Sequence, residues 1–162
     1  MYSPTFRRNG RDSIKEVIDS VDTNKYNLVI TLHELDAAKA ENHKKEGVLI
    51  NPKIHFPSLL KIADYVITDY SALMIEAAIL KTNILLYVYD YEQYDKENGL
   101  NVNLFDELPG YTSKNIKDLI KVIEKDNYNK KTLLNFREKF ITNLTKDSTK
   151  KIFKLIKGEL KW

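Results

Sequence analysis

Apolar and polar positions along the first two-thirds of the chain follow two alternating patterns. Short runs rich in β-branched and aromatic residues are typical of strands, and between them lie segments with the apolar spacing of helices. The expected strands are the end of one at Tyr2–Phe6, then Asn27–Leu32, Val48–Ile50, Tyr65–Thr68 and Ile84–Tyr89. The expected helices are Ser13–Val21, Asp36–Lys45, Pro57–Ile62 and Ala72–Leu80. This alternation predicts an α/β fold, a Rossmann-like parallel sheet with right-handed connections and helices on both faces.

The last third of the chain departs from this pattern. Asp90–Tyr111 combines several aromatic residues with glycines and a proline and shows neither the alternating spacing of a strand nor the apolar spacing of a helix. This predicts a long irregular segment, and such segments are often functional. Three helices are expected after it, at Asn115–Glu124, Lys130–Ile141 and Ser148–Lys157, and they would form a helical C-terminal layer. Because no repeat or low-complexity linker interrupts the sequence, residues 1–162 are expected to form a single domain.

Composition excludes several classes of function. The chain contains no cysteine, which rules out disulfides, thiolate catalysis and cysteine-ligated zinc and is compatible with a cytoplasmic location. Its three histidines, His33, His43 and His55, do not have metal-ligand spacing on one element, so no metal site is expected. No apolar run approaches the length that crosses a bilayer, and no signal-peptide pattern opens the sequence.

The net charge of +3 is unevenly distributed along the chain. Residues 1–113 hold 12 Lys/Arg and 17 Asp/Glu, a net charge of −5, whereas residues 114–162 hold 14 and 6, a net charge of +8. A basic C-terminal third can attract a phosphate-rich polymer, anionic lipid or nucleic acid. The interpretation we favour is that these lysines cover the outer faces of packed helices, and we predict no nucleic-acid partner.

Polar residues follow several of the expected strands. A parallel α/β sheet binds its ligand at the carboxyl ends of its strands. The residues expected at such ends are Thr5, Arg7, His33, Asp69, Ser71 and Asp90. Ser71 stands at the expected N-cap of Ala72–Leu80, where unpaired N–H groups, the helix dipole and a hydroxyl would converge on an anion such as phosphate. A serine-capped helix without a ligand is the alternative.

Four sequence blocks together resemble a known family. They are Tyr2-Ser3-Pro4-Thr5-Phe6-Arg7, Leu32-His33, Ala63–Ser71 with its Thr-Asp-Tyr-Ser turn, and Phe105-Asp106-Glu107-Leu108-Pro109-Gly110. The set resembles the C-terminal half of the CDP-glycerol glycerophosphotransferase family, which polymerises teichoic acids and related cell-surface polymers. The resemblance runs from about Tyr2 to about Ile156. It implies one CDP-alditol-binding domain, half of a GT-B-type fold, without the N-terminal acceptor domain of the family.

The resemblance also implies roles for two residues at the donor pyrophosphate. His33 is implied to be catalytic and to contact the pyrophosphate. In the family this histidine usually lies in a Lys-x-His-Pro motif, whereas Thr31 and Glu34 stand at the lysine and proline positions here. The missing lysine removes a cation from the neighbourhood of the phosphates. Arg7 is implied to bind the pyrophosphate, because a guanidinium can hold two phosphate oxygens at once.

Other residues are implied to belong to the same donor site. Further implied substrate-binding residues are Thr5, Thr68 and Ser71. Asp69 is expected to order its turn by accepting backbone N–H bonds or to hold His33 in place. Asp147 and Ser148 resemble a late Asp-Gly-x-Ser segment that lies near the cytidine ribose in the family, although N-capping explains the pair equally well.

The implied reaction is phosphotransfer from CDP-glycerol or a related CDP-alditol. An acceptor hydroxyl on a lipid-linked polymer attacks the β-phosphorus and expels CMP, and positive groups rather than a metal or cofactor stabilise the leaving phosphate. Two alternatives remain: half of a nucleotide-sugar glycosyltransferase, and a non-catalytic interaction module of the same fold. Fold alone does not distinguish them.

The end of the chain carries an apolar stripe flanked by lysines. The stripe consists of Ile152, Phe153, Leu155, Ile156 and Leu160, with Trp162 at the terminus. Such a surface can pack on the helical layer, dimerise or lie on an anionic membrane. The third possibility predicts a peripheral position on the inner face of the cell membrane.

Overall fold

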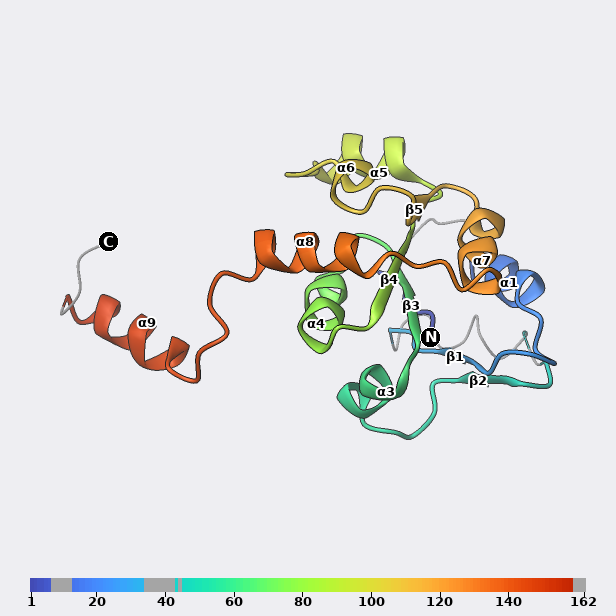
Figure 1. Ribbon diagram of the computed structural model, residues 1–162, viewed down its shortest axis with the longest axis horizontal. Helices are drawn as coiled ribbons and strands as arrows, with labels where there is room; N and C mark the ends of the chain where they lie inside the picture. Colours follow the sequence, from blue (N-terminus) through green and yellow to red (C-terminus); the bar gives the residue numbers. More distant parts are fainter. Residues whose placement is uncertain (7–12, 34–42, 44, 159–162) are drawn as a thin grey trace.

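A parallel β-sheet with five named strands forms the centre of the described part of the molecule. The computed structural model describes residues 1–6, 13–33, 43 and 45–158 (Figure 1). In one part of the sheet β1 (Leu28–Ile30) pairs with β2 (Val48–Ile50). In the other, β4 (Asn83–Tyr87) lies between β3 (Tyr65–Thr68) and β5 (Thr112–Ser113). The prediction of a parallel sheet is confirmed.

The N-terminal residues join these two parts into one sheet. Tyr2 forms parallel bridges to both Ile30 and Ile67. Its N–H donates to the Val29 carbonyl at 2.8 Å, and the Ile67 N–H donates to the Met1 carbonyl at 2.8 Å. The order across the sheet is therefore β2, β1, residues 1–3, β3, β4, β5, so the chain runs first to one edge and then to the other. This is the Rossmann order, and its reversal lies between residues 1–3 and β3.

The expected strand over Tyr2–Phe6 is shorter in the structure. Ser3 still donates its N–H to the Ile67 carbonyl at 2.9 Å, but the Thr5 N–H turns to the side chain of Asp69 instead of a neighbouring strand. Tyr2 itself is 1% exposed, and burial raises the pKa of its phenol, which donates to Ser13 Oγ at 2.8 Å. The first strand therefore ends where the polar residues begin.

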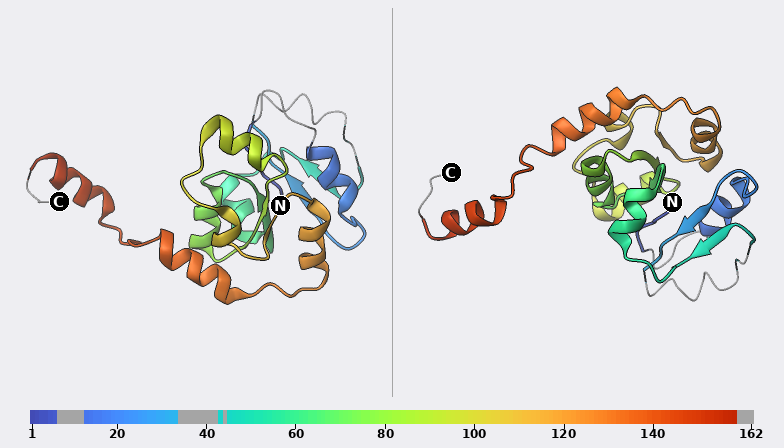
Figure 2. Two further views of the ribbon diagram at one scale, coloured as in Figure 1. Left: turned by 90° about the horizontal axis from the view of Figure 1, so that it is seen from above. Right: turned by 60° about the horizontal axis from the view of Figure 1, so that its bottom comes forward.

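Helices cover both faces of the sheet, as predicted. On one side lie α1 (Ser13–Ser20) and α7 (Ile116–Glu124), and on the other lie α3 (Phe56–Ile62), α4 (Leu73–Leu80) and α8 (Lys130–Phe140) (Figures 1 and 2). The buried residues of α1 and α7 recur every three to four positions, which is the pattern of an amphipathic helix on a core. The expected helix Asp36–Lys45 falls almost wholly outside the described residues.

The segment Asp90–Tyr111 is not irregular, contrary to our prediction. It contains α5 (Tyr91–Asn98) and the short helix α6 (Leu104–Glu107). No residue of α5 is buried, so this helix has no apolar stripe for a periodicity argument to detect. It ends at Gly99, whose φ of 75° suits glycine.

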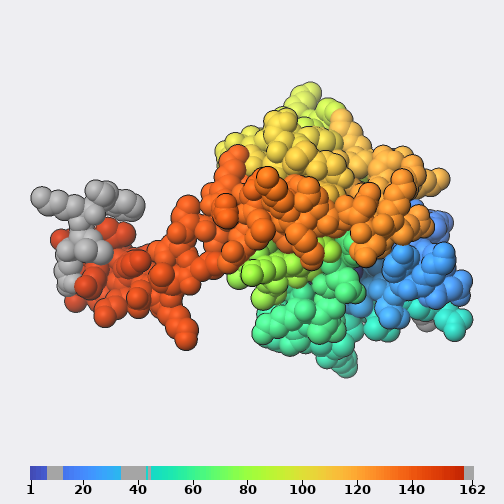
Figure 3. Space-filling view, in the orientation of Figure 1, coloured from blue at the N-terminus to red at the C-terminus, as the bar shows by residue number. Residues whose placement is uncertain are grey.

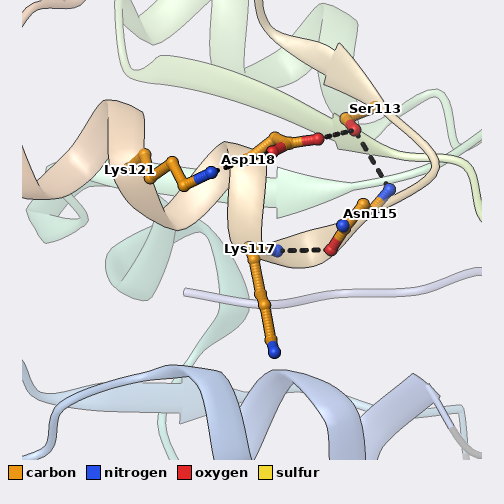
Figure 4. A network of polar contacts seen from close by, with 5 residues as sticks. All are labelled: Ser113, Asn115, Lys117, Asp118 and Lys121. Atoms are coloured by element: carbon orange, nitrogen blue, oxygen red, sulfur yellow. Dashed lines mark hydrogen bonds and ion pairs between the residues drawn. The ribbon is translucent and has the colours of Figure 1, made fainter.

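Polar caps fix the junction between β5 and α7 (Figure 4). Ser113 Oγ accepts the Asn115 N–H at 3.0 Å and donates to Asp118 at 3.2 Å. Asn115 Oδ1 accepts the Lys117 N–H at 3.0 Å, so Asn115 is the N-cap of α7. The predicted start of this helix is confirmed, whereas the two-residue strand β5 before it was too short to predict.

The last helix stands apart from the others. Of the three helices expected in a C-terminal layer, α7 packs on the sheet and α8 packs against α4. In contrast, α9 (Ser148–Ile156) has no buried residue and projects from the domain (Figure 3).

Replacement of a leucine at the centre of the sheet should destabilise the domain. Leu86 in β4 is 0% exposed, so Leu86→Ala is expected to lower the free energy of unfolding by about 2–5 kcal/mol, measured by urea denaturation. Leu134→Ala in α8 is the matched control, because Leu134 is 41% exposed and its truncation should change this free energy by no more than about 0.5 kcal/mol. Equal losses in the two variants would contradict this description of the core.

Candidate active site

A buried carboxylate lies where the strand order reverses. Asp69 directly follows β3 and is 3% exposed. Its two oxygens accept the Thr5 backbone N–H at 3.1 and 2.9 Å, and Oδ1 also accepts the Thr5 hydroxyl at 2.6 Å. Hydrogen bonds to an ionised carboxylate are short and strong. Asp69 therefore ties the end of the N-terminal segment to the turn after β3, at the point where Rossmann-type sheets bind ligands.

A second hydroxyl strengthens the same junction. Thr68 is 0% exposed and donates its hydroxyl proton to the Ser3 carbonyl at 2.7 Å. The hydroxyl groups of Thr5 and Thr68 thus both donate hydrogen bonds to acceptors within the protein. In this arrangement they shape the edge of the sheet. Asp69 accepts a backbone N–H as expected, but from Thr5, just beyond the first strand, rather than from its own turn.

Ser71 supplies the cap hydrogen bond at the start of α4. Its Oγ accepts the Leu73 N–H at 3.2 Å, and its carbonyl accepts the Met74 N–H at 3.2 Å. The helix begins at Leu73 with Ala72 as its assigned cap, one residue later than predicted. These first amide groups are therefore paired, which corrects the expectation of free donors. The Ser71 hydroxyl proton is not used in the cap bond and can donate to an anion beside the helix dipole.

His33 lies at the same end of the sheet. It is exposed, three residues beyond the end of β1, and its ring centroid lies 5.5 Å from that of Phe6. Phe6 follows Thr5, so the contact brings His33 to the junction held by Asp69. Sequence reasoning missed Asn51, which follows β2 and accepts the Leu32 N–H at 2.7 Å through Oδ1.

An aromatic cluster attaches α5 and α6 to this edge. Tyr70 stacks on Tyr94 with ring centroids 3.7 Å apart, and its hydroxyl donates to Asp90 at 3.1 Å. Tyr91 meets Phe105 edge to face at 5.2 Å. Because Tyr70 lies next to Asp69, these contacts hold the segment after β4 beside the candidate site. The density of aromatic residues in Asp90–Tyr111 was the sequence signal for this arrangement.

Two predicted site residues, Asp147 and Ser148, are not brought to this edge, and a third, Arg7, lies outside the described residues. Asp147 and Ser148 lie at the start of α9, away from the strand ends (Figure 1). Ser148 donates its hydroxyl to the Thr145 carbonyl at 3.2 Å, and Asp147 makes no side-chain cap bond.

A cavity of about 580 Å³ lies at the opposite end of the strands. Its lining includes Asn27, Leu28, Asp64 and Tyr65, which are at the amino ends of β1 and β3. None of the predicted site residues lines it. Within the described part of the chain, no group of three His, Cys, Asp or Glu side chains could hold a metal ion.

Comparison with known proteins identifies the family. The sequence model of CDP-Glycerol:Poly(glycerophosphate) glycerophosphotransferase matches residues 1–158. This chain belongs to the CDP-glycerol glycerophosphotransferase family. The resemblance found in the sequence blocks is thereby confirmed.

Curated relatives of this glycerophosphotransferase-like domain act in teichoic acid synthesis. It is 26% identical to a teichoic acid ribitol-phosphate primase of Bacillus spizizenii, over 99% of this chain and 44% of the primase. It is 32% identical to a teichoic acid glycerol-phosphate primase of Staphylococcus aureus, over 76% of this chain and 32% of that protein. The chain therefore spans less than half the length of these relatives.

Solved structures confirm the fold of this family member. The wall teichoic acid polymerase TagF superposes with a TM-score of 0.71 at 22% identity, over 98% of this chain and 42% of TagF. Another TagF structure, soaked with CDPG, gives a TM-score of 0.69 at 24% identity. Among the described residues of this glycerophosphotransferase-like domain, no helix has the length and apolar character needed to cross a membrane.

Loss of the Asp69 carboxylate should open the junction between the first strand and β3. Asp69→Ala removes the acceptor of all three Thr5 bonds and is expected to lower the free energy of unfolding by about 1.5–3 kcal/mol in urea denaturation. Thr5→Val is the matched variant: it removes only the hydroxyl donor, so a loss of about 0.5–1.5 kcal/mol is expected. If Asp69→Ala unfolds at the same urea concentration as the unmodified chain, the junction does not hold the sheet together.

Proposed function

We propose that this chain is the donor-binding domain of a glycerophosphotransferase of cell-surface polymer synthesis. Its ligand is CDP-glycerol or a related CDP-alditol, bound at the carboxyl edge of the sheet between residues 1–6 and β3. The observation that carries the proposal is the Asp69–Thr5 junction, which shapes the reversal point of a Rossmann-type sheet in a chain of this family. The soak of TagF with CDPG supports this class of donor.

The pyrophosphate of the donor is proposed to lie between His33, Arg7 and Ser71. An acceptor hydroxyl attacks the β-phosphorus, and the bond to the CMP oxygen breaks as the new phosphodiester forms. The departing phosphate gains negative charge, which the α4 dipole, the Ser71 hydroxyl and the Arg7 guanidinium would stabilise. His33 is the proposed catalytic residue because a ring N–H can donate to the departing phosphate.

The remaining residues of the edge have a positioning role in this proposal. Thr5, Thr68 and Asp69 hold the two chain segments that flank the donor, since their polar atoms bond to one another and to Ser3. The proposal leaves out Asp147 and Ser148, because they lie at the start of α9, away from the sheet edge. We propose that the complete reaction, with a lipid-linked polymer as acceptor, is carried out by longer proteins. The ribitol-phosphate primase, of which this chain covers 44%, is an example of such a longer relative.

We also propose that α9 lies on the inner face of the cell membrane, where lipid-linked acceptors are found. Ile152, Phe153 and Ile156 are 57%, 54% and 78% exposed and share one side of the helix. At 100° per residue, the opposite side carries Lys150, Lys151 and Lys154, while Lys157 at the end of the helix lies over the Phe153 ring, 4.8 Å from its centroid. No acidic residue occurs between Ser148 and Ile156, unlike in α7, which mixes both signs. A basic amphipathic helix suits an anionic bilayer surface.

The donor proposal predicts a preference for cytidine nucleotides. Calorimetric titration of the chain with CDP-glycerol, CMP, UMP and ADP should detect binding of the two cytidine compounds and weaker or no binding of the others. The absence of any cytidine binding at millimolar concentration would contradict the proposal.

Variants of the three pyrophosphate residues should weaken this binding without unfolding the domain. His33→Ala, Arg7→Ala and Ser71→Ala each remove a group beside the phosphates, and a loss of about tenfold or more is expected for Arg7→Ala, since charge-assisted bonds are worth about 1.5–3 kcal/mol. His55→Ala is the matched control, because His55 is exposed and its side chain makes no cap bond to α3. Circular dichroism checks the fold. Normal binding by all three variants would refute the roles given to them.

The membrane proposal predicts that the chain co-sediments with phosphatidylglycerol vesicles but not with phosphatidylcholine vesicles at physiological salt. Replacement of both Phe153 and Ile156 by serine should strongly reduce co-sedimentation, because it removes two of the three exposed apolar side chains while keeping every lysine. Leu144→Ser is the control, since Leu144 is 50% exposed but precedes α9. Equal sedimentation of the unmodified chain and the double variant would exclude attachment through α9.

A further inference from the structure

Asn51 has an unusual backbone conformation at the end of β2. Its φ is 44°, in the left-handed region that non-glycine residues rarely occupy. Pro52 follows it directly and further restricts the backbone of the preceding residue. Strain of this kind persists only where other contacts enforce it, and it is concentrated at functional sites.

Two hydrogen bonds enforce this conformation. The Asn51 N–H donates to the Ile30 carbonyl at 2.8 Å and extends the pairing of β2 with β1 by one step. Its side-chain Oδ1 accepts the Leu32 N–H at 2.7 Å. Any residue except proline could supply the first bond, whereas the second requires a short side chain with an acceptor and a residue that tolerates positive φ. Asparagine meets both requirements.

The side-chain bond acts on the residue immediately before His33. From the end of β1 at Ile30, only Thr31 and Leu32 separate the sheet from His33. The Asn51 bond to Leu32 fixes this short connection on one side, and the ring contact of His33 with Phe6 at 5.5 Å lies at its end. We infer that Asn51 is a positioning residue that sets the direction of the His33 imidazole. This inference rests on the proposed role of His33 in donor binding.

Three variants separate the side-chain acceptor from the backbone strain. Asn51→Gly relieves the positive φ but removes the acceptor, and Asn51→Asp keeps both the acceptor and the tolerance of positive φ. Lys53→Ala is the control in the same loop, because Lys53 is exposed and lies two residues further on. Each is measured by calorimetric titration with CDP-glycerol, alone and combined with His33→Ala.

The losses of CDP-glycerol affinity caused by changes at Asn51 and at His33 are expected not to be additive. Asn51→Gly should weaken binding about three- to tenfold, as befits one hydrogen bond. Asn51→Asp should lose less than Asn51→Gly, because it keeps the acceptor although its negative charge disfavours the anionic donor, and Lys53→Ala should bind like the unmodified chain. In the His33→Ala background, Asn51→Gly should cause no further loss, because Asn51 acts through His33. Additive losses, or unaltered binding by Asn51→Gly, overturn the inference.

A second measurement does not depend on ligand binding. The aromatic ring current of Phe6 is expected to shift the NMR signals of the His33 ring protons, because the two ring centroids are 5.5 Å apart. Comparison with Phe6→Leu, which has no aromatic ring, measures the size of this shift. Asn51→Gly should reduce the shift and Asn51→Asp should retain it. If the unmodified chain binds no cytidine nucleotide, the donor proposal fails and these signals alone decide the positioning role. Unchanged His33 signals in Asn51→Gly overturn it.

Discussion

The buried carboxylate of Asp69 is the constraint on which the rest of the site depends. A carboxylate that is 3% exposed needs hydrogen-bond donors within the protein, and it takes them from Thr5. Because the Thr5 N–H donates to Asp69, it does not pair with a neighbouring strand, and the first strand ends after residue 3. Phe6 follows Thr5 and contacts His33, while Ser71 lies two residues after Asp69 and caps α4. A single interaction at the reversal of strand order thus assembles residues that are far apart in the sequence.

The candidate site and the cavity lie at opposite ends of the strands. The 580 Å³ cavity lies at the amino ends of the strands, far from these polar residues, and its lining is mainly apolar. The chain corresponds to 42% of the TagF structure, and the candidate site lies within the part of the fold that the two share. Fold similarity explains the sheet and its order, whereas the proposed chemistry is argued from Asp69, Ser71 and His33 individually.

Much of the fold could be predicted from apolar spacing alone. The buried strands β3 and β4 and the amphipathic helices α1 and α7 each carry a strong pattern, so their positions were correct to within a few residues. Spacing could not reveal α5, because that helix buries no residue. It also could not assign Asn51, since the 2.7 Å bond to Leu32 depends on a backbone conformation that sequence does not encode directly. The internal use of the Thr5 and Thr68 hydroxyls appeared only with the side chains in place.

The central claim, that the donor binds at the carboxyl edge beside the Asp69–Thr5 junction, is tested most directly by NMR mapping of bound CDP-glycerol. Backbone amide signals are compared with and without the ligand at increasing concentration. The account predicts that the largest changes occur at Thr5, His33, Asp69 and Ser71, with Asn27 and Asp64 at the amino ends unaffected. Changes concentrated around the cavity at Asn27 and Asp64, with the carboxyl edge unaltered, would contradict it.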